Sequence, residues 1–175
     1  MKFSIGVSVE VLSATPGTLR SLLGGLSDEW TSSFGDRENW QPYDVLGHLI
    51  HGEKTDWIPR ARIILEQGED REFETFDRVA QFENSEGSTV NDLLDEFERL
   101  RAANLEVLKG WQLTEEQLVL MGIHPQLGPA SLRQLIATWA VHDLNHIRQI
   151  VTAMAKRYDE AVGPWKPYLG VLNSK

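Results

Sequence analysis

The sequence contains no cysteine. This absence excludes disulfide bonds, thiolate metal ligands and a cysteine nucleophile. A metal ion bound by this chain would therefore be held by nitrogen and oxygen atoms. Any thiol that takes part in its chemistry would have to arrive as a cosubstrate.

Long apolar runs and basic clusters are also missing. No apolar stretch approaches the roughly 20 residues of a membrane-spanning helix. The segment Met1–Ser4 does not lead into the apolar core and cleavage site of a signal peptide. The formal net charge is −9 without a cluster of Lys and Arg, so a nucleic-acid backbone is not an expected partner. We therefore expect a cytoplasmic protein that binds neither membranes nor nucleic acid.

The composition is that of an ordinary globular chain. With 175 residues, of which 41% are hydrophobic and 25% charged, the chain fits a single domain over residues 1–175 with its own core. Helical periodicity dominates, and the pattern shows no strand pair. The sequence therefore predicts an all-α four-helix bundle of the up-and-down type, with a long crossover connection between the second and third helices.

Caps and breakers place the predicted helices along the chain. The apolar positions on both sides of Pro16 face one way, which favours a single first helix that is kinked there over a helix that begins there. Pro42 opens the second helix, which Ile58-Pro59 should kink or restart. The third helix begins at Ser88 or Thr89 and ends at Gly110, and the fourth runs from the cap at Ser131 to about Tyr158. Residues 121–129 are predicted to be irregular, and the tail at 165–169 is predicted to pack on the bundle.

The connection over residues 67–87 is long for a compact domain. It carries seven acidic and two basic residues, with Phe73, Phe76 and Phe82 between them. Long connections of this kind are often functional. The segment would either fold back as a lid over the end of the bundle or form a solvated crossover whose phenylalanines only pack.

Three histidines lie at inward positions of two predicted helices. His142 and His146 are four residues apart, so both lie on one face of the last helix. That face is the apolar one, which contains Leu132, Leu135, Trp139, His142, His146 and Ile150. His48 shares the inward stripe of the second helix with Val45 and Leu49. The three imidazoles could therefore converge.

Converging histidines suit a catalytic metal site. Three neutral imidazoles around a divalent ion leave a coordination position for water or substrate. Zn²⁺ and Ni²⁺ both suit imidazole ligands. Such an ion would polarise a carbonyl group or lower the pKa of a water molecule or thiol. The alternative is that the histidines are core residues hydrogen-bonded to other side chains or to carbonyl groups.

Several neighbouring side chains are further candidates. Four could act near the ion as ligands, bases or hydrogen-bonding partners, although each also has a structural interpretation: His51, Glu53, Asn145 and Gln149. Asp56 could likewise donate a carboxylate. Asp143 points about 100° away from His142 on the helix and is not expected to bind the same ion. His124 precedes a proline and is interpreted as a loop residue. No general base stands out, so catalytic residues are not assigned.

The motifs carry a resemblance to a known family. It rests on Trp40, Asp44–Leu49, Leu132–Ile136 and His142–Ile150, whose order and spacing resemble the DinB-like (YfiT-like) superfamily of metal-dependent enzymes. The resemblance implies a four-helix bundle, often a homodimer, with the metal held by His48, His142 and His146. Gln41 departs from the family, which often has Ser or Thr at this helix start.

Two functional hypotheses follow. The first is a metal-dependent enzyme that acts on a small molecule as a hydrolase or as a thiol-dependent S-transferase with a low-molecular-weight thiol cosubstrate. The alternative is a non-catalytic helical bundle that binds a metal or another ligand. A third and weaker hypothesis is a metal-free bundle with three buried histidines.

Overall fold

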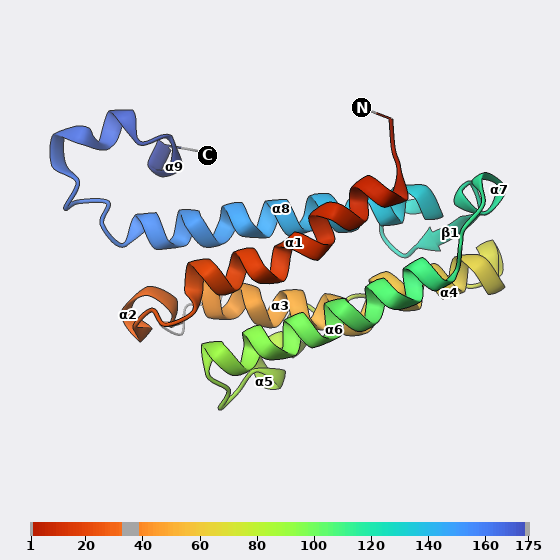
Figure 1. The fold of residues 1–175 in the computed structure, drawn as a ribbon, viewed down its shortest axis with the longest axis horizontal. Helices are drawn as coiled ribbons and strands as arrows, with labels where there is room; N and C mark the ends of the chain where they lie inside the picture. The colour runs from red at the N-terminus through yellow and green to blue at the C-terminus, as the bar shows by residue number, and fades with distance from the viewer. Residues whose placement is uncertain (1, 33–38, 174–175) are drawn as a thin grey trace.

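Four long helical segments lie lengthwise beside one another in the computed structural model, which describes residues 2–32 and 39–173 (Figure 1). They are α1 (Ile5–Leu23), α3 (Pro42–Thr55) continued by α4 (Trp57–Glu66), α6 (Val90–Gly110) and α8 (Leu132–Lys156). Helices α1 and α3 each pack against both α6 and α8. This arrangement confirms the predicted all-α four-helix bundle. Within the described ranges, no helix is both long and apolar enough to cross a membrane.

Short elements connect and extend the four segments. In chain order they are α2 (Asp28–Thr31), η1 (Gly68–Asp70), α5 (Ala80–Asn84), α7 (Glu115–Leu118), β1 (Met121–His124), β2 (Gly128–Ser131), η2 (Gly163–Tyr168) and α9 (Gly170–Asn173). The break between α3 and α4 falls at Asp56, three residues before Pro59. Proline is tolerated in the first turn of a helix, so a restart just before it is the expected outcome.

The connection between α4 and α6 returns along the length of the bundle. As Figure 1 shows, α6 begins at the end of the bundle where α3 begins, so α3 and α6 run in the same direction. A long crossover connection is what such parallel neighbours require. The predicted crossover is therefore present, and the up-and-down alternation of the helices is interrupted there.

Local sequence signals set the starts of these helices. The Thr89 hydroxyl accepts a hydrogen bond of 3.1 Å from the backbone N–H of Asp92, whose carboxylate accepts one from the Thr89 N–H. Ser131 and Gln134 make the same reciprocal pair at the start of α8. At α3 the backbone N–H of Gln41 donates to the Asp44 carboxylate at 2.9 Å. Each pair satisfies N–H groups that a helix start leaves without partners.

Pro16 lies inside α1, which continues through it from Ile5 to Leu23. A proline here has no backbone N–H to donate to the carbonyl of Leu12, four residues earlier. That carbonyl instead accepts a hydrogen bond of 2.9 Å from Nη1 of Arg101 in α6. The prediction of one helix through Pro16 is confirmed, and the acceptor that proline leaves free ties α1 to α6.

The prediction that residues 121–129 are irregular and that the chain lacks a strand pair is wrong. Strands β1 and β2 form a two-stranded antiparallel hairpin in which His124 lies opposite Gly128. Gly128 has a φ of 76°, a conformation that glycine adopts readily at tight turns. Each strand has only four residues, and they include glycine and proline, so alternation of apolar and polar residues could not reveal them.

The predicted packing of the tail at 165–169 is also wrong for its two largest side chains. Trp165 is 68% exposed and Tyr168 is 87% exposed. The tail contacts α8 through the short helix α9 instead. The aromatic composition of the tail therefore predicted more burial of these two side chains than the structure shows.

The core has two apolar clusters with a polar layer between them. One cluster contains Leu105 and Trp57, and the other contains Phe97 and Leu49. Arg101 lies between Phe97 and Leu105 on α6, and only 1% of it is exposed. The residues around Arg101 come from all four long segments, so this layer fixes their relative positions.

Candidate metal centre

The three predicted histidines converge between α3 and α8. The Nε2 atom of His142 lies 3.2 Å from Nε2 of His48 and 3.0 Å from Nε2 of His146. One ring nitrogen from each of the three residues lies within 4.8 Å of the others. These separations match the space around a single ion, because zinc ligands lie about 2.0–2.1 Å from the metal.

Burial of the three rings follows from the helical pattern. His146 is buried, and His48 and His142 are partly buried. Aromatic side chains enclose them: the rings of Phe76 and His48 lie 5.2 Å apart, and those of Trp57 and His142 lie 5.0 Å apart. The inward stripe predicted for both helices is thus confirmed at these positions.

Two glutamine side chains hold the far nitrogens of two rings. Nδ1 of His48 lies 3.0 Å from Oε1 of Gln81, and Nδ1 of His146 lies 2.8 Å from Oε1 of Gln149. A carbonyl oxygen can only accept, so these contacts place the ring proton on Nδ1 and leave the Nε2 lone pair free. Hydrogen bonds of this kind orient the histidine ligands of metal sites. Nδ1 of His142 has no partner within the described part of the chain.

Gln81 reaches His48 because α5 approaches α3 closely. At Gly47, beside His48, an added Cβ atom would lie 2.4 Å from Oγ of Ser85 and 3.4 Å from the carbonyl oxygen of Gln81. A larger side chain at position 47 would therefore require the Ser85 hydroxyl to move. Gln81 was not predicted from the sequence, whereas Gln149 was among the candidates near the ligands.

The surroundings keep the three rings uncharged. Burial, and then the neighbouring His146, lowers the pKa of His48 to about 4. Burial, followed by the charges of His146 and His48, lowers the pKa of His142 to about 2. Burial also lowers the pKa of His146. At neutral pH all three therefore present the neutral imidazole that binds metal ions.

His51 and His124 lie outside the group of three clustered histidines. His51 is buried, with its ring 4.8 Å from that of Phe76, so it is not the surface residue that one interpretation predicted. His124 lies in β1, where its Nδ1 accepts hydrogen bonds from the backbone N–H groups of Gln126 and Leu127. Neither histidine belongs to the metal-competent group.

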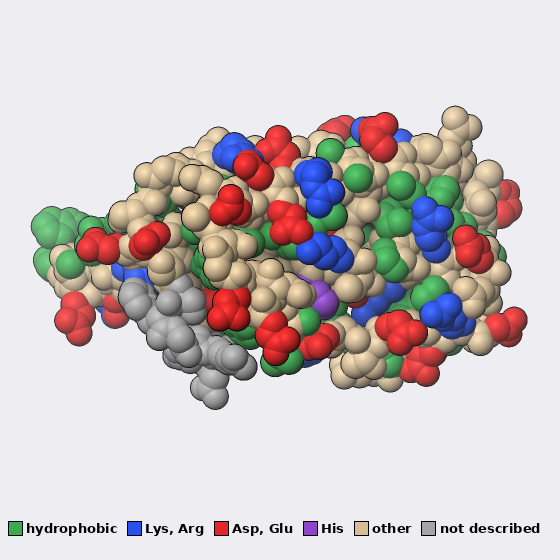
Figure 2. Space-filling view, turned by 90° about the horizontal axis from the view of Figure 1, so that it is seen from below, with side chains coloured by type: hydrophobic (Ala, Val, Ile, Leu, Met, Phe, Trp, Pro, Cys, Tyr) green, Lys and Arg blue, Asp and Glu red, His purple; other side chains and the backbone are tan. Residues whose placement is uncertain are grey.

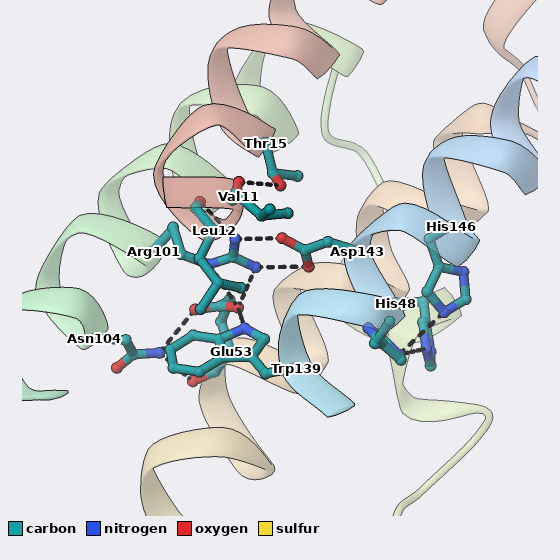
Figure 3. A network of polar contacts seen from close by, with 11 residues as sticks. Val11, Leu12, Thr15, His48, Glu53, Arg101, Asn104, Trp139, Asp143 and His146 are labelled. Carbon is teal, nitrogen blue, oxygen red and sulfur yellow. Dashed lines mark hydrogen bonds and ion pairs between the residues drawn. The ribbon is translucent and has the colours of Figure 1, made fainter. Parts of the chain in front are cut away.

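Glu53 belongs to the buried polar layer rather than to the histidine site. One oxygen of its carboxylate accepts hydrogen bonds from Arg101 and from Nε1 of Trp139, and the other accepts one from Asn104. Figure 3 shows this group on the opposite side of α8 from His48 and His146. Both oxygens of Glu53 are therefore engaged in holding the bundle together.

Asp143 turns away from the histidines, as its position on the helix predicts. It is fully buried and forms a two-point ion pair with Arg101, with N–O distances of 2.5 and 2.9 Å. Burial opposes the charge on Arg101, but the hydrogen bond to Asp143 and the charge of Glu53 raise its pKa overall. Arg101 was not singled out from the sequence, because an arginine on a helix usually points to solvent.

A cavity of about 410 Å³ opens beside the histidine cluster. Its volume is within the usual range for small-molecule sites. Figure 2 shows histidine atoms at the surface on one face of the molecule, with basic and acidic side chains around them. The cavity is lined by Trp40, His48, Asp56, Arg60, Thr75, Phe76, Arg78, His124, Pro125, Gln126, Leu127 and His146.

The long connection between α4 and α6 lies against this region. Phe73 is part of the apolar core, Phe76 contacts the rings of His48 and His51, and Phe82 packs edge-on against Trp40. The connection therefore folds back over the histidines. Its function as a lid stays a prediction.

Removing either glutamine contact is expected to weaken metal binding about 10- to 100-fold. Replacement of Gln81 or Gln149 by methionine keeps most of the volume but frees the ring of His48 or His146 to rotate and change tautomer. Competition with a chromophoric chelator measures the dissociation constant. Asn145→Ala is the matched control, because the Asn145 side chain bonds to Arg148 rather than to a histidine. Unchanged affinity in both glutamine variants would contradict this positioning role.

Comparison with known proteins agrees with the observed fold. A model described as the DinB superfamily matches residues 12–150. Among solved structures, a similar chain is YfiT from Bacillus subtilis, described as a probable metal-dependent hydrolase with an unusual four-helix bundle topology. Its TM-score is 0.74 at 18% sequence identity, and the match covers 89% of this chain and 90% of that chain. No curated protein sequence matches significantly. Because the family model spans well over half of the sequence, the chain belongs to the DinB superfamily.

Proposed function

We propose that this protein is a metal-dependent enzyme in which His48, His142 and His146 hold one divalent ion and the adjoining cavity binds a small-molecule substrate. The observation that carries the proposal is the convergence of three Nε2 atoms, at 3.0 and 3.2 Å, with the far nitrogens of His48 and His146 held by Gln81 and Gln149. Without an ion, only His142 can carry its proton on Nε2, and that single N–H cannot donate fully to the lone pairs of both other rings. A shared cation accepts all three lone pairs.

Hydrolysis is the reaction that this arrangement supports best. A divalent ion with three imidazole ligands supplies Lewis acidity and a position at which the pKa of water or of a thiol falls. The protein provides neutral ligands and a partly enclosed cavity whose walls include the aromatic side chains of Trp40 and Phe76. The similarity to YfiT, described as a probable metal-dependent hydrolase, supports the same choice.

A panel of reactions with the metal-loaded protein tests the proposal. Ester and amide substrates test hydrolysis, and an electrophile with a low-molecular-weight thiol tests S-transfer. We expect metal-dependent turnover in the hydrolytic panel, and its loss in His142→Ala. Turnover only with the thiol would favour the transferase instead. Stoichiometric metal without turnover in either panel would favour a non-catalytic bundle that binds metal.

Asp56 is the carboxylate of the cavity and is a candidate proton acceptor. Burial raises its pKa to about 6, although the ion pair with Arg60 at 2.8 Å acts in the opposite direction. A base works in its deprotonated form, so its contribution is absent well below pH 6 and complete above it. The rate should therefore rise as the pH increases through about 6.

Replacing Asp56 by asparagine is expected to lower kcat by about 100-fold. It should also remove the rise of kcat with pH through about 6, which is the acid limb of the pH profile. The pH dependence of kcat, measured from pH 5 to 8 beside the unfolding midpoint of each protein, checks the prediction. Glu53→Gln serves as a comparison, because Glu53 is a buried carboxylate on α3 that points away from the cavity. An unchanged acid limb in the Asp56 variant would show that another group accepts the proton.

A further inference from the structure

The lining of the cavity beside the histidines combines two kinds of group. His48 and His146 are proposed metal ligands, and the rings of Trp40 and Phe76 lie 5.0 and 5.2 Å from the ring of His48. The charged side chains of the lining come from the junction of α3 and α4 and from the connection that follows α4. A bound molecule that reaches the metal therefore also meets charged groups.

The charges that line the cavity do not balance. Its lining includes two arginines, Arg60 and Arg78, and one carboxylate, Asp56. Asp56 is already paired with the buried Arg60 at 2.8 Å. Arg78 is exposed and has no ion pair within the described part of the chain. The cavity thus has one uncompensated positive charge, in a protein whose formal net charge is −9.

An unpaired arginine and a divalent ion that share one cavity both attract an anion. Like charges that share a cavity repel each other, and a bound anion converts this repulsion into attraction at both ends. The guanidinium group presents parallel N–H donors that match a carboxylate in a two-point contact. One guanidinium group supplies the two N–H donors that a single carboxylate accepts.

We infer that the substrate of this site is a carboxylate-bearing small molecule, with its carboxylate on Arg78 and its reacting group directed at the three histidines. The inference rests on the proposed metal-dependent function and specifies its substrate class. Trp40 and Phe76 would pack against the segment that joins the two groups. Arg78 is a binding residue in this account and takes no part in the bond-breaking step.

Three hydroxamates of one chain length test the inference. Succinic monohydroxamate ends in a carboxylate, butanohydroxamate in a methyl group and 4-aminobutanohydroxamate in an ammonium group. Hydroxamates bind metal ions, so each probe addresses the histidine end equally. Isothermal titration of the zinc-loaded protein gives the three dissociation constants. We expect the carboxylate probe to bind about 10-fold more tightly than the methyl probe, and the ammonium probe to bind most weakly.

Variants decide whether Arg78 is responsible. Arg78→Gln should bring the carboxylate and methyl probes to within about 2-fold of each other. Arg99→Gln removes the same charge from an exposed position on α6, outside the cavity, and should leave the preference intact. Equal affinities in the wild type, or a preference that survives Arg78→Gln, would overturn the inference.

Metal content separates this test from that of the proposed function. If the protein takes up no zinc, the proposed function fails, and the titrations are repeated on the metal-free protein with succinate and butanamide. Arg78 remains in that protein, so succinate should still bind more tightly than butanamide and lose its advantage in Arg78→Gln. If zinc is bound but the probes show no charge preference, only the substrate class is wrong.

Discussion

Replacing Arg101 by methionine is expected to lower the free energy of unfolding by about 3–5 kcal/mol. Arg101 is almost completely buried and forms ion pairs with two buried carboxylates, those of Glu53 and Asp143. It also donates to the carbonyl of Leu12, which has no helical donor because of Pro16. The variant would leave all three acceptors without this donor in the centre of the bundle, where water cannot replace it.

The effect on stability is measured by urea unfolding. Arg20→Met is the matched control, because Arg20 also pairs with two carboxylates, Asp95 and Glu98, but does so at the surface. Exposed ion pairs contribute roughly 0–1 kcal/mol, so the control should stay close to the wild type. If the free energy of unfolding of Arg101→Met fell by less than about 1 kcal/mol, the buried polar layer would not be what holds the helices together.

Replacing His142 by alanine is expected to weaken metal binding by roughly 100-fold or more and to abolish metal-dependent turnover. His142 is the central residue of the cluster, because its Nε2 lies within hydrogen-bond distance of both His48 and His146. Two ligands from different helices hold an ion much less firmly than three, since each lost ligand must be replaced by water.

A chelator competition measures this change in affinity. His124→Ala is the matched control: it removes a histidine that lines the same cavity but does not belong to the cluster. Its metal affinity should equal that of the wild type. If His142→Ala kept wild-type affinity while His124→Ala lost it, the metal would be bound elsewhere in the cavity.

The helices and the convergence of the histidines could be predicted from the sequence. His142 and His146 occupy positions of an apolar helical stripe, and His48 does so on another helix, so burying both stripes brings the rings together. Capping pairs such as Thr89 with Asp92 placed the helix starts correctly. These signals are local and periodic, and they can be read along one chain.

The groups that support the site depend on contacts between distant segments. Gln81 lies 33 positions after His48, in the short helix α5, and it meets that ring only because Gly47 lets α5 approach. No periodicity marks such a residue. The assignment of Asp56 rather than Glu53 to the cavity likewise depends on how α3 ends, which the carboxylates themselves do not reveal.

Arg101 is a case in which a signal was present. Leu94, Phe97, Arg101, Leu105 and Leu108 are spaced by 3, 4, 4 and 3 residues, so the arginine falls in the middle of a buried stripe. An arginine at such a position requires buried acidic partners. Glu53 and Asp143 occupy corresponding inward positions on α3 and α8, and the three together predict the polar layer.

X-ray absorption at the zinc and nickel edges, on protein purified without a metal-binding tag, tests the central claim most directly. The account predicts about one divalent ion per chain, with a shell of three imidazole nitrogens at about 2.0–2.1 Å. A protein that binds no metal even after reconstitution, or a metal whose shell lacks those three imidazoles, would contradict it.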